Sequence, residues 1–300
     1  MKICLTGGGS GGHFYPLIAV AQELRKQSHE QALADLSLIY MAPAPYNEGL
    51  LFDYDIAFSR VPAGKRRRYL SVRNIVDLFV TGWGVAVALV KMFYHYPDVV
   101  FAKGGFGSFP VLCAARFFRI PVIVHESDTV PGRVTAWAGR FARYVALSYP
   151  EAAAYFPDEK VAVTGQPIRP DLTPIRDGSH AHFNLGEDRP TILVLGGSQG
   201  AARINDAIVN ALPGLTEQYN VIHQAGEKNA DVVYETAEVV LHNEESKQSR
   251  YKVFATLDAQ TLRYAAGIAD CVVTRAGSSL FEIARWQIPA IVVPITHSNG

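Results

Sequence analysis

Hydrophobic positions along this 300-residue chain gather in short runs, most of which end at glycine, proline or a small polar residue. Short apolar runs bounded by turn residues are typical of buried strands. Such runs lie before residue 165 at residues 2–6, 36–41, 98–102, 121–125, 144–148 and 160–164. Segments with helical spacing of apolar residues separate several of them, for example 16–26 and 110–118. The alternation predicts an α/β fold with a doubly wound parallel sheet.

The same pattern begins again in the second half of the chain. Residues 165–179, GQPIRPDLTPIRDGS, contain three prolines and no apolar periodicity, which predicts a linker. After it, TILVLGGSQGAARINDAIVNAL resembles the opening KICLTGGGSGGHFYPLIAVAQEL, and further strands are predicted at 219–226, 252–256, 270–277 and 289–294. We therefore expect two similar domains, 1–164 and 180–300. We expect the second to be truncated, because its last residues form a loop with no closing helix.

Charge excludes some classes of partner. The 28 Lys and Arg residues balance 28 Asp and Glu residues, so no net charge attracts nucleic acid or a membrane. Any such attraction must come from a local patch. The longest apolar stretch, residues 78–90, is shorter than the ~20 residues that cross a bilayer. We expect no membrane-spanning segment and no nucleic-acid partner.

A glycine-rich loop, TGGGSGGH, follows the first predicted strand. Gly7, Gly9 and Gly12 fit the dinucleotide fingerprint G-x-G-x-x-G. A nicotinamide site also needs an acidic residue at the end of the second strand, which here ends in Met41-Ala42-Pro43. The sequence therefore disfavours NAD. The glycines either bring backbone N–H groups and a helix N-terminus close to another ligand, or serve only a tight strand-to-helix turn.

Further polar and glycine-rich clusters follow other predicted strands. They are KGGFGSFP (103–110), HESD (125–128), GQPIR (165–169), GGSQG (196–200) and TRAGSSLFE (274–282). Open α/β sheets bind ligands at the carboxyl ends of their strands. The amides and hydroxyls of Ser278 and Ser279 suit a phosphate, and Glu282 suits a ribose. A single His125-Glu126 pair is as often structural, so the set of motifs carries the prediction.

The chain resembles the MurG family of bacterial N-acetylglucosaminyltransferases in a series of motifs. In chain order these are GGGSGGHFYP, GGFGSFP, HES, TGQPIR, LGGSQGA and TRAGSSLFEIA. The resemblance covers nearly the whole chain. It implies the GT-B fold, in which two Rossmann-like domains face a cleft. It also implies an enzyme of peptidoglycan synthesis, and so of cell-wall biogenesis, cell shape and cell division. Such an enzyme transfers N-acetylglucosamine (GlcNAc), with inversion, from UDP-GlcNAc to the muramoyl 4-hydroxyl of undecaprenyl-pyrophosphoryl-MurNAc-pentapeptide, converting lipid I to lipid II.

The resemblance also implies roles for individual residues. Ser198 and Gln199 would meet the diphosphate, Glu282 the ribose and Leu257 the uracil. The full donor-binding set is Ser10, Gly11, Gly12, Asp128, Arg169, Ser198, Gln199, Leu257, Gly277, Ser278, Ser279, Leu280, Phe281 and Glu282. The acceptor-binding set is Gly104, Gly105, Phe106, Gly107, Ser108 and His125. Two features depart from the family: HESD replaces HEQN, and the downstream D-H-Q segment is absent.

An inverting transfer needs a base for the attacking hydroxyl. His13 stands at the start of a predicted helix, where the positive dipole end disfavours imidazolium and keeps the ring neutral. Glu126 is the alternative base, and His13 could instead only hydrogen-bond its loop. The motifs at the predicted strand ends contain no D-x-D sequence and no His/Asp cluster with metal-ligand spacing, so we expect neither a metal nor another cofactor. Helix N-termini and Arg169 would stabilise the leaving UDP.

A basic cluster precedes the longest apolar stretch. It consists of Lys65, Arg66, Arg67, Arg68 and Arg73, and the apolar stretch contains Phe79, Trp83 and Phe93. The pair is either a solvated loop beside a buried helix or a patch that binds anionic headgroups and the membrane interface. A lipid-linked acceptor favours the patch, so we expect peripheral attachment at the cytoplasmic face of the bacterial cell membrane.

Three other functions share parts of this pattern. A glycolipid synthase would use the same donor site with a diacylglycerol acceptor. A UDP-GlcNAc 2-epimerase would share the two-domain cleft without any transfer. A non-catalytic protein would bind the nucleotide only.

Overall fold

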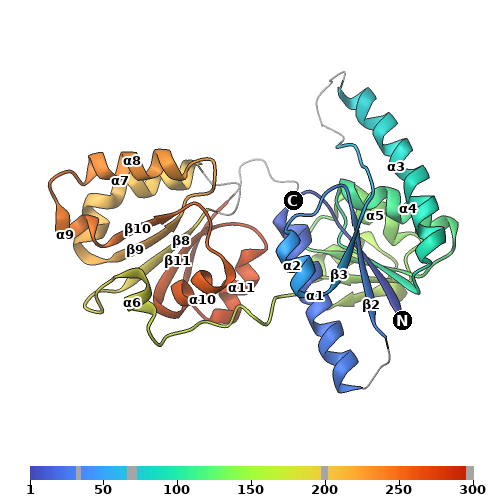
Figure 1. Ribbon diagram of the computed structural model, residues 1–300, viewed down its shortest axis with the longest axis horizontal. Coiled ribbons are helices and arrows are strands. Elements are labelled where there is room, and N and C mark those ends of the chain that lie inside the picture. The colour runs from blue at the N-terminus through green and yellow to red at the C-terminus, as the bar shows by residue number, and fades with distance from the viewer. Residues whose placement is uncertain (32–34, 66–72, 197–201, 295–300) are drawn as a thin grey trace. The chain divides into compact units, whose positions relative to one another are not determined.

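The computed structural model describes residues 1–31, 35–65, 73–196 and 202–294. The chain divides into two compact units, Met1–Arg169 and the residues from Pro170 onward. Each unit has its own sheet, and all strand pairs in both sheets are parallel. The predicted α/β class with two doubly wound sheets is confirmed (Figure 1).

The first sheet has the strand order β3-β2-β1-β4-β5-β6-β7. Its strands are β1 (Lys2–Thr6), β2 (Ser37–Ala42), β3 (Ile56–Arg60), β4 (Val99–Ala102), β5 (Val122–Glu126), β6 (Tyr144–Leu147) and β7 (Val161–Val163). The apolar runs predict all of these except β3. That strand lies at the edge of the sheet and buries only Ile56 and Ser59, so its sequence carries no continuous apolar run.

Helices cover both faces of the first sheet. One face packs against α1 (Gly11–Glu30) and α2 (Glu48–Asp53), with Phe14, Leu17 and Ile18 in the core. The other face packs against α3 (Arg73–His95), α4 (Phe109–Phe117) and α5 (Arg133–Gly139). Short 3-10 turns occur at η1 (Phe106–Ser108), η2 (Pro150–Tyr155) and η3 (Asp158–Lys160). In Figure 1 the first half of α3 projects beyond the rest of the unit.

The second sheet has the order β10-β9-β8-β11-β12. Its strands are β8 (Thr191–Leu195), β9 (Asn220–Gln224), β10 (Tyr251–Phe254), β11 (Ala269–Arg275) and β12 (Ala290–Val293). The helices α7 (Ala202–Gln218) and α8 (Ala230–Val240) cover one face, and α9 (Glu245–Gln248) follows α8. The other face carries α6 (Ser179–Phe183), α10 (Ala259–Ile268) and α11 (Ser279–Trp286), as Figure 1 shows.

Most of the predicted linker 165–179 packs on the second unit. The indole N–H of Trp286 donates to the Leu172 carbonyl at 2.7 Å. The backbone at Ile175 crosses Gly267 so closely that a Cβ there would lie 1.6 Å from the Ile175 oxygen. The division between units falls at Arg169, within the expected segment. Because of its prolines and glycines, the sequence of this segment shows no apolar periodicity. The structure nevertheless buries Leu172.

The strand order brings two glycine loops together. It reverses at β1, whose neighbours are β2 and β4, and the loops after β1 and β4 therefore meet at the topological switch point. A Cβ on Gly8 would lie 2.6 Å from the Cα of Gly107, so these loops pack backbone against backbone. Gly9 has φ +84°, and a Cβ there would meet the Phe106 ring at 2.5 Å. These glycines are required by the packing of the protein itself.

We predict that Gly8→Ala lowers the free energy of unfolding by about 1–3 kcal/mol, because the added methyl group forces two backbones apart. Urea unfolding followed by circular dichroism measures the loss. Gly82→Ala is the matched control, since a Cβ at Gly82 on α3 meets nothing within 4 Å. Equal stabilities for the two variants would contradict the proposed contact.

Candidate functional site

The carboxyl ends of the first sheet collect the predicted motifs. The loops TGGGSGGH and KGGFGSFP follow β1 and β4, HESD ends β5, and GQPIR comes soon after β7. Because the strands are parallel, all four segments lie at one edge of the sheet. This edge is the candidate site of the first unit.

His13 is held between the two glycine loops. It occupies the first turn of α1, and its Nδ1 lies 2.9 Å from the Oγ of Ser10, the N-cap residue. On the other side, a Cβ at Gly105 would lie 3.2 Å from His13 Nε2. One ring nitrogen is therefore oriented by its own loop, while the other faces the loop after β4.

The His13 imidazole is neutral at pH 7. Burial, and after it the positive charge of Lys103, lower its pKa to about 4. The sequence predicts the neutral ring from the helix dipole, whereas the structure adds these two causes. A neutral imidazole is the protonation state that a general base needs.

Lys103 is a site residue that sequence reasoning did not single out. It directly follows β4 and is only 3 % exposed. Its ammonium group bonds to Nδ1 of His125 at 2.8 Å, to the Ser127 hydroxyl and to Oε1 of Gln166 at 3.4 Å. Burial lowers the Lys103 pKa to about 8, although Glu126 and Asp128 act to raise it. A lysine directly after a buried strand is the sequence signal, because lysine is almost never fully buried unless it is paired.

His125, expected at the acceptor, has both ring nitrogens engaged within the protein. Nε2 bonds to the Gly165 carbonyl at 2.9 Å, and Nδ1 takes its bond from Lys103. Burial and the charge of Lys103 lower the His125 pKa to about 3, against the effect of the Gly165 carbonyl. The side chain is 1 % exposed, so it supports the site from within.

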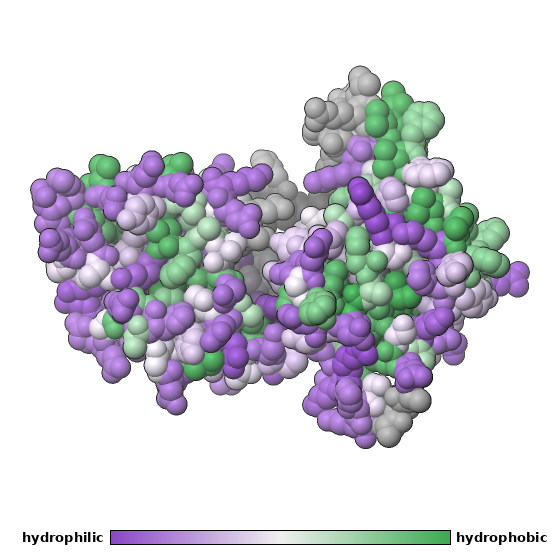
Figure 2. Space-filling model, in the orientation of Figure 1, coloured by the Kyte–Doolittle hydropathy of each residue, from purple (hydrophilic) through white to green (hydrophobic). Residues whose placement is uncertain are grey.

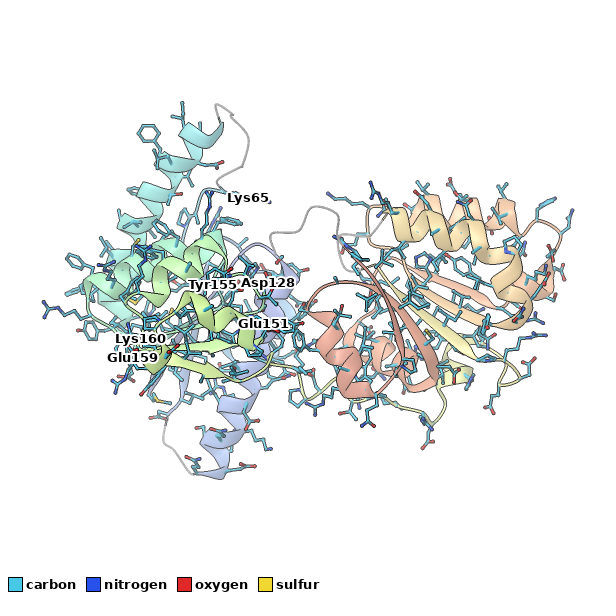
Figure 3. All side chains as sticks on the ribbon, turned by 180° about the vertical axis from the view of Figure 1, so that it is seen from behind. Lys65, Asp128, Glu151, Tyr155, Glu159 and Lys160 are labelled. Atoms are coloured by element: carbon cyan, nitrogen blue, oxygen red, sulfur yellow. The ribbon has the colours of Figure 1, made fainter. Side chains whose placement is uncertain are left out.

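Glu126, expected as the alternative base, binds the backbone of the turn that follows it in the chain. Its carboxylate accepts backbone N–H groups from Ser127 at 2.8 Å, Asp128 at 3.1 Å and Gly132 at 3.0 Å. The side chain is buried, whereas Asp128 is exposed at the same strand end (Figure 3). The structure therefore gives Glu126 a clear role in loop shape.

Only part of the expected acceptor loop, residues 104–108, is accessible from outside the protein. Gly105 and Phe106 are half-buried, while Gly104, Gly107 and Ser108 are buried. The Ser108 hydroxyl donates to the Gly105 carbonyl at 2.9 Å and holds the turn. Gly105 and Phe106 are thus the residues of this loop that can face a ligand.

Arg169 is the last residue of the first unit's main segment and follows β7 at the carboxyl side of the sheet. Its guanidinium lies 4.6 Å from the centre of the Tyr15 ring, on α1, and the residue is 7 % exposed. Its Nε has no hydrogen-bond partner among the described residues. A cation held on an aromatic ring with an unused donor suits an anionic ligand.

The carboxyl edge of the second sheet gathers the expected nucleotide residues. Gly277 is exposed after β11, and the residues from Ser278 to Glu282 are half-buried at the start of α11. The Leu257 N–H, beyond β10, donates to Oε1 of Gln224 at 3.2 Å. Ser198 and Gln199 lie outside the described residues.

Helix α3 exposes an apolar face. Gly84, Ala88 and Met92 are buried at intervals of one helical turn. The exposed apolar residues of the helix are Ile75, Val76, Leu78, Phe79, Trp83, Val90, Phe93 and Tyr94, and Figure 2 shows the hydrophobic surface they form. Patches of this kind mark protein or membrane contact sites.

The apolar helix is longer than the stretch 78–90 suggests. Ile75–His95 is long and apolar enough to cross a bilayer by length and composition. However, its buried side belongs to the core shared with α4, including Val111 and Leu112. Lys65 is exposed before the helix, as labelled in Figure 3, whereas Arg66, Arg67 and Arg68 lie outside the described residues.

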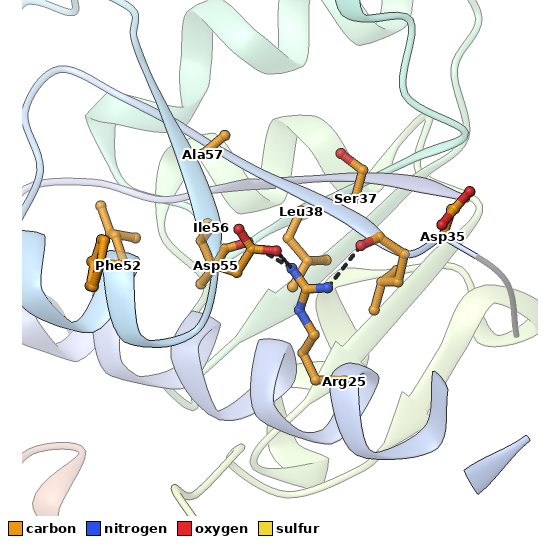
Figure 4. A pocket seen from close by; sticks show the side chains of 10 residues that line it. Arg25, Asp35, Ser37, Leu38, Phe52, Asp55, Ile56 and Ala57 are labelled. Carbon is orange, nitrogen blue, oxygen red and sulfur yellow. Dashed lines mark hydrogen bonds and ion pairs between the residues drawn. The ribbon is translucent and has the colours of Figure 1, made fainter. Parts of the chain in front are cut away.

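A pocket of about 620 Å³ lies at the opposite edge of the first sheet, where β2 and β3 begin (Figure 4). Arg25 donates there to the Leu36 carbonyl at 2.9 Å and to the Asp55 carboxylate at 2.8 Å. The pocket is lined by Arg25, Asp35, Leu36, Ser37, Leu38, Leu51, Phe52, Asp55, Ile56 and Ala57. Arg25 and Asp55 pair with each other, and the pocket is separate from the candidate site. Across the described part of the chain, no group of three or more His, Cys, Asp or Glu side chains could hold a metal ion.

Comparison with known families gives matches in both units. The model of the glycosyltransferase family 28 N-terminal domain matches residues 3–147, and that of its C-terminal domain matches residues 191–300. A UDP-N-acetylglucosamine–N-acetylmuramyl-(pentapeptide) pyrophosphoryl-undecaprenol N-acetylglucosamine transferase of Shouchella clausii is 36% identical over 305 residues, covering 100% of this chain and 80% of the relative. A Bacillus cereus protein of the same name is 35% identical over 298 residues, covering 98% and 79%.

Solved structures share the fold. MurG of Acinetobacter baumannii has a TM-score of 0.65 at 23% identity and covers 99% of this chain and 79% of its own. A UDP-GlcNAc 2-epimerase of Neisseria meningitidis bound to UDP-GlcNAc has a TM-score of 0.65 at 15% identity, covering 97% and 82%. At these identities the likeness concerns the fold alone.

We predict that His13 titrates near pH 4, because burial and Lys103 both disfavour its charged form. The ring would then stay neutral until the pH falls to about 4. Nuclear magnetic resonance of the histidine ring protons, with His13→Ala to assign the signal, measures this value. A midpoint at the ordinary value of 6.5 would contradict the described environment.

Proposed function

Because this chain belongs to glycosyltransferase family 28, and within it to the MurG family of N-acetylglucosamine transferases, we propose that it converts lipid I to lipid II. The protein is a glycosyltransferase. It moves GlcNAc from UDP-GlcNAc to the muramoyl 4-hydroxyl of undecaprenyl-pyrophosphoryl-MurNAc-pentapeptide. The main support for this proposal is the 35–36% identity, over 98–100% of the chain, with relatives whose names state this transfer.

The first unit supplies a base for the acceptor hydroxyl. As the muramoyl oxygen attacks C1 of GlcNAc, its proton passes to the free ring nitrogen of neutral His13, and the bond from C1 to the UDP oxygen breaks on the opposite face. One displacement of this kind inverts the anomeric centre. The Ser10 hydroxyl, 2.9 Å from Nδ1, orients the ring for this step. Bound phosphate groups bring negative charge that favours the imidazolium as it forms.

The second unit supplies the nucleotide site. The N-terminus of α11, with Ser278 and Ser279, suits the diphosphate, and Glu282 in its first turn suits the ribose hydroxyls. Leu257 would lie beside the uracil. Ser198, Gln199 and Arg169 are assigned to the donor phosphates by the family resemblance, and the unused Nε of Arg169 supports its part.

The same fold serves epimerases, so the reaction itself must be tested. Radiolabelled UDP-GlcNAc is incubated with the protein, with and without a short-chain lipid I analogue. We expect label in the lipid product only when the analogue is present. Formation of UDP-N-acetylmannosamine without acceptor would identify an epimerase, and transfer to diacylglycerol alone would identify a glycolipid synthase.

The apolar face of α3 and the basic segment before it support peripheral membrane attachment. Phe79 and Trp83 are 75 % and 66 % exposed on the helix that projects from the first unit. Basic residues next to such a face attract anionic headgroups, while aromatic side chains insert at the interface. The packed side of α3 keeps the helix on the surface of its unit. We place the protein at the cytoplasmic face of the cell membrane, where a lipid-linked acceptor is reached.

We predict that His13→Ala lowers kcat of the transfer by 10²–10⁴-fold, the usual contribution of a general base. The affinity for UDP and the melting temperature should change little, because the second unit carries the nucleotide site. His29→Ala, at the exposed far end of the same helix, is the matched control. A loss of less than about tenfold would remove His13 as the base and favour Glu126.

We predict that replacing Lys65, Arg66, Arg67 and Arg68 by Gln weakens binding to anionic vesicles by about 1 kcal/mol per charge. Vesicle flotation at low and high salt measures the effect. The matched control removes the same number of charges elsewhere, at Lys26, Arg140, Lys160 and Lys228. Replacing Phe79 and Trp83 by Ser should weaken binding at high salt as well. If the basic-cluster variant floats with the vesicles as the parent protein does, the basic cluster is only a solvated loop and does not bind the headgroups.

A further inference from the structure

Lys103 has an ammonium group whose hydrogen bonds are all used inside the protein. It carries three N–H donors, and its three acceptors are Nδ1 of His125, the Ser127 hydroxyl and Oε1 of Gln166. Each of these acceptors is neutral, because the bond from the ammonium requires an unprotonated Nδ1. Lys103 therefore has no donor left for a substrate phosphate, and its role is to act through its neighbours.

The bonds around Lys103 connect four neighbouring strands. Lys103 follows β4, and Ser127 follows β5. Ser148 follows β6 and donates to Oε1 of Gln166 at 2.9 Å, and Gln166 itself comes after β7. The Ser127 hydroxyl also donates to this oxygen at 2.9 Å. We call these four residues, together with His125, the Lys103 network.

The backbone and Cβ of Lys103 lie close to the loop that leads into α1. The Lys103 backbone N–H donates to the Thr6 carbonyl at 2.8 Å, at the end of β1. A Cβ on Gly7 would lie 3.3 Å from the Lys103 Cβ and 3.4 Å from the His13 carbonyl oxygen, so both residues pack against Gly7. Among the described groups, Glu126 and Asp128 act on Lys103 from the end of β5, and Lys103 acts on His13 and His125.

We propose that Lys103 is a positioning residue of the transfer site, which ties the carboxyl ends of β4 to β7 together and holds a fixed positive charge beside His13. This charge adds to burial in keeping His13 unprotonated before the acceptor binds. The inference rests on the proposed function for the role of His13 as base, and it names the residue that prepares that base.

The test is the titration of His13 in the free protein, which needs no substrate. Lys103→Met keeps the side-chain length and removes the charge, so the His13 pKa should rise by about one unit or more. Lys160→Met removes a lysine at the end of η3, away from the network (Figure 3), and should leave the His13 pKa unchanged.

A second variant keeps Lys103 in place. The amide nitrogen of Gln166 has no partner among the described residues, so Gln166→Glu loses no observed bond and gives Lys103 a carboxylate partner. The ion pair keeps that carboxylate ionised and offsets the lysine charge, and the His13 pKa should again rise. If Lys103→Met does not fold, the His13 pKa in Gln166→Glu tests the proposal by itself.

An unchanged His13 pKa in folded Lys103→Met, or in Gln166→Glu, would overturn the proposal. In the transfer assay, the acid limb of the kcat/KM profile should move to higher pH in both variants. If the protein proved to have no transferase activity, the substrate-free titration would still report on Lys103, so the two failures are distinguishable.

Discussion

The backbone contact between Gly8 and Gly107 is the constraint on which the candidate site of the first unit depends. It exists because the strand order of the first sheet reverses at β1, which sends the loops after β1 and β4 toward each other. Without side chains at these positions, the loops meet closely enough to enclose the His13 ring against Gly105. The same close approach places Lys103, the last residue before the second loop, next to the start of α1.

One buried cation of this site, Lys103, acts on two histidines. An ammonium removed from water is costly unless its hydrogen bonds are satisfied, and here three neutral acceptors satisfy them. Two buried imidazoles beside it, His13 and His125, are kept neutral by burial and by that charge. One of them is locked between Lys103 and Gly165, and only the other can exchange a proton with a substrate. The chemical difference between the two histidines therefore comes from their partners.

Much of this fold could be predicted from the sequence, because buried parallel strands appear as continuous apolar runs. The exception, β3, is an edge strand that buries only Ile56 and Ser59, and Ile56 alone gives too little apolar signal. The motifs at the strand ends predict where the site lies, but not how its side chains pair. His125 and Glu126 look like free chemical groups in the sequence, and only the structure shows the backbone groups that engage them. A single lysine beside glycines forms no pattern, so the sequence does not predict the role of Lys103, although its place directly after a buried strand is informative.

In the proposed transfer, one neutral base drives a single displacement at the anomeric carbon. The most direct measurement is the configuration of the new glycosidic bond, read by proton nuclear magnetic resonance of the product formed from UDP-GlcNAc, an α-linked donor, and a soluble lipid I analogue. A single displacement gives a β-linked GlcNAc, with the large coupling between H1 and H2 that trans-diaxial protons give. An α-linked product would show that the configuration is retained and would rule out the single displacement.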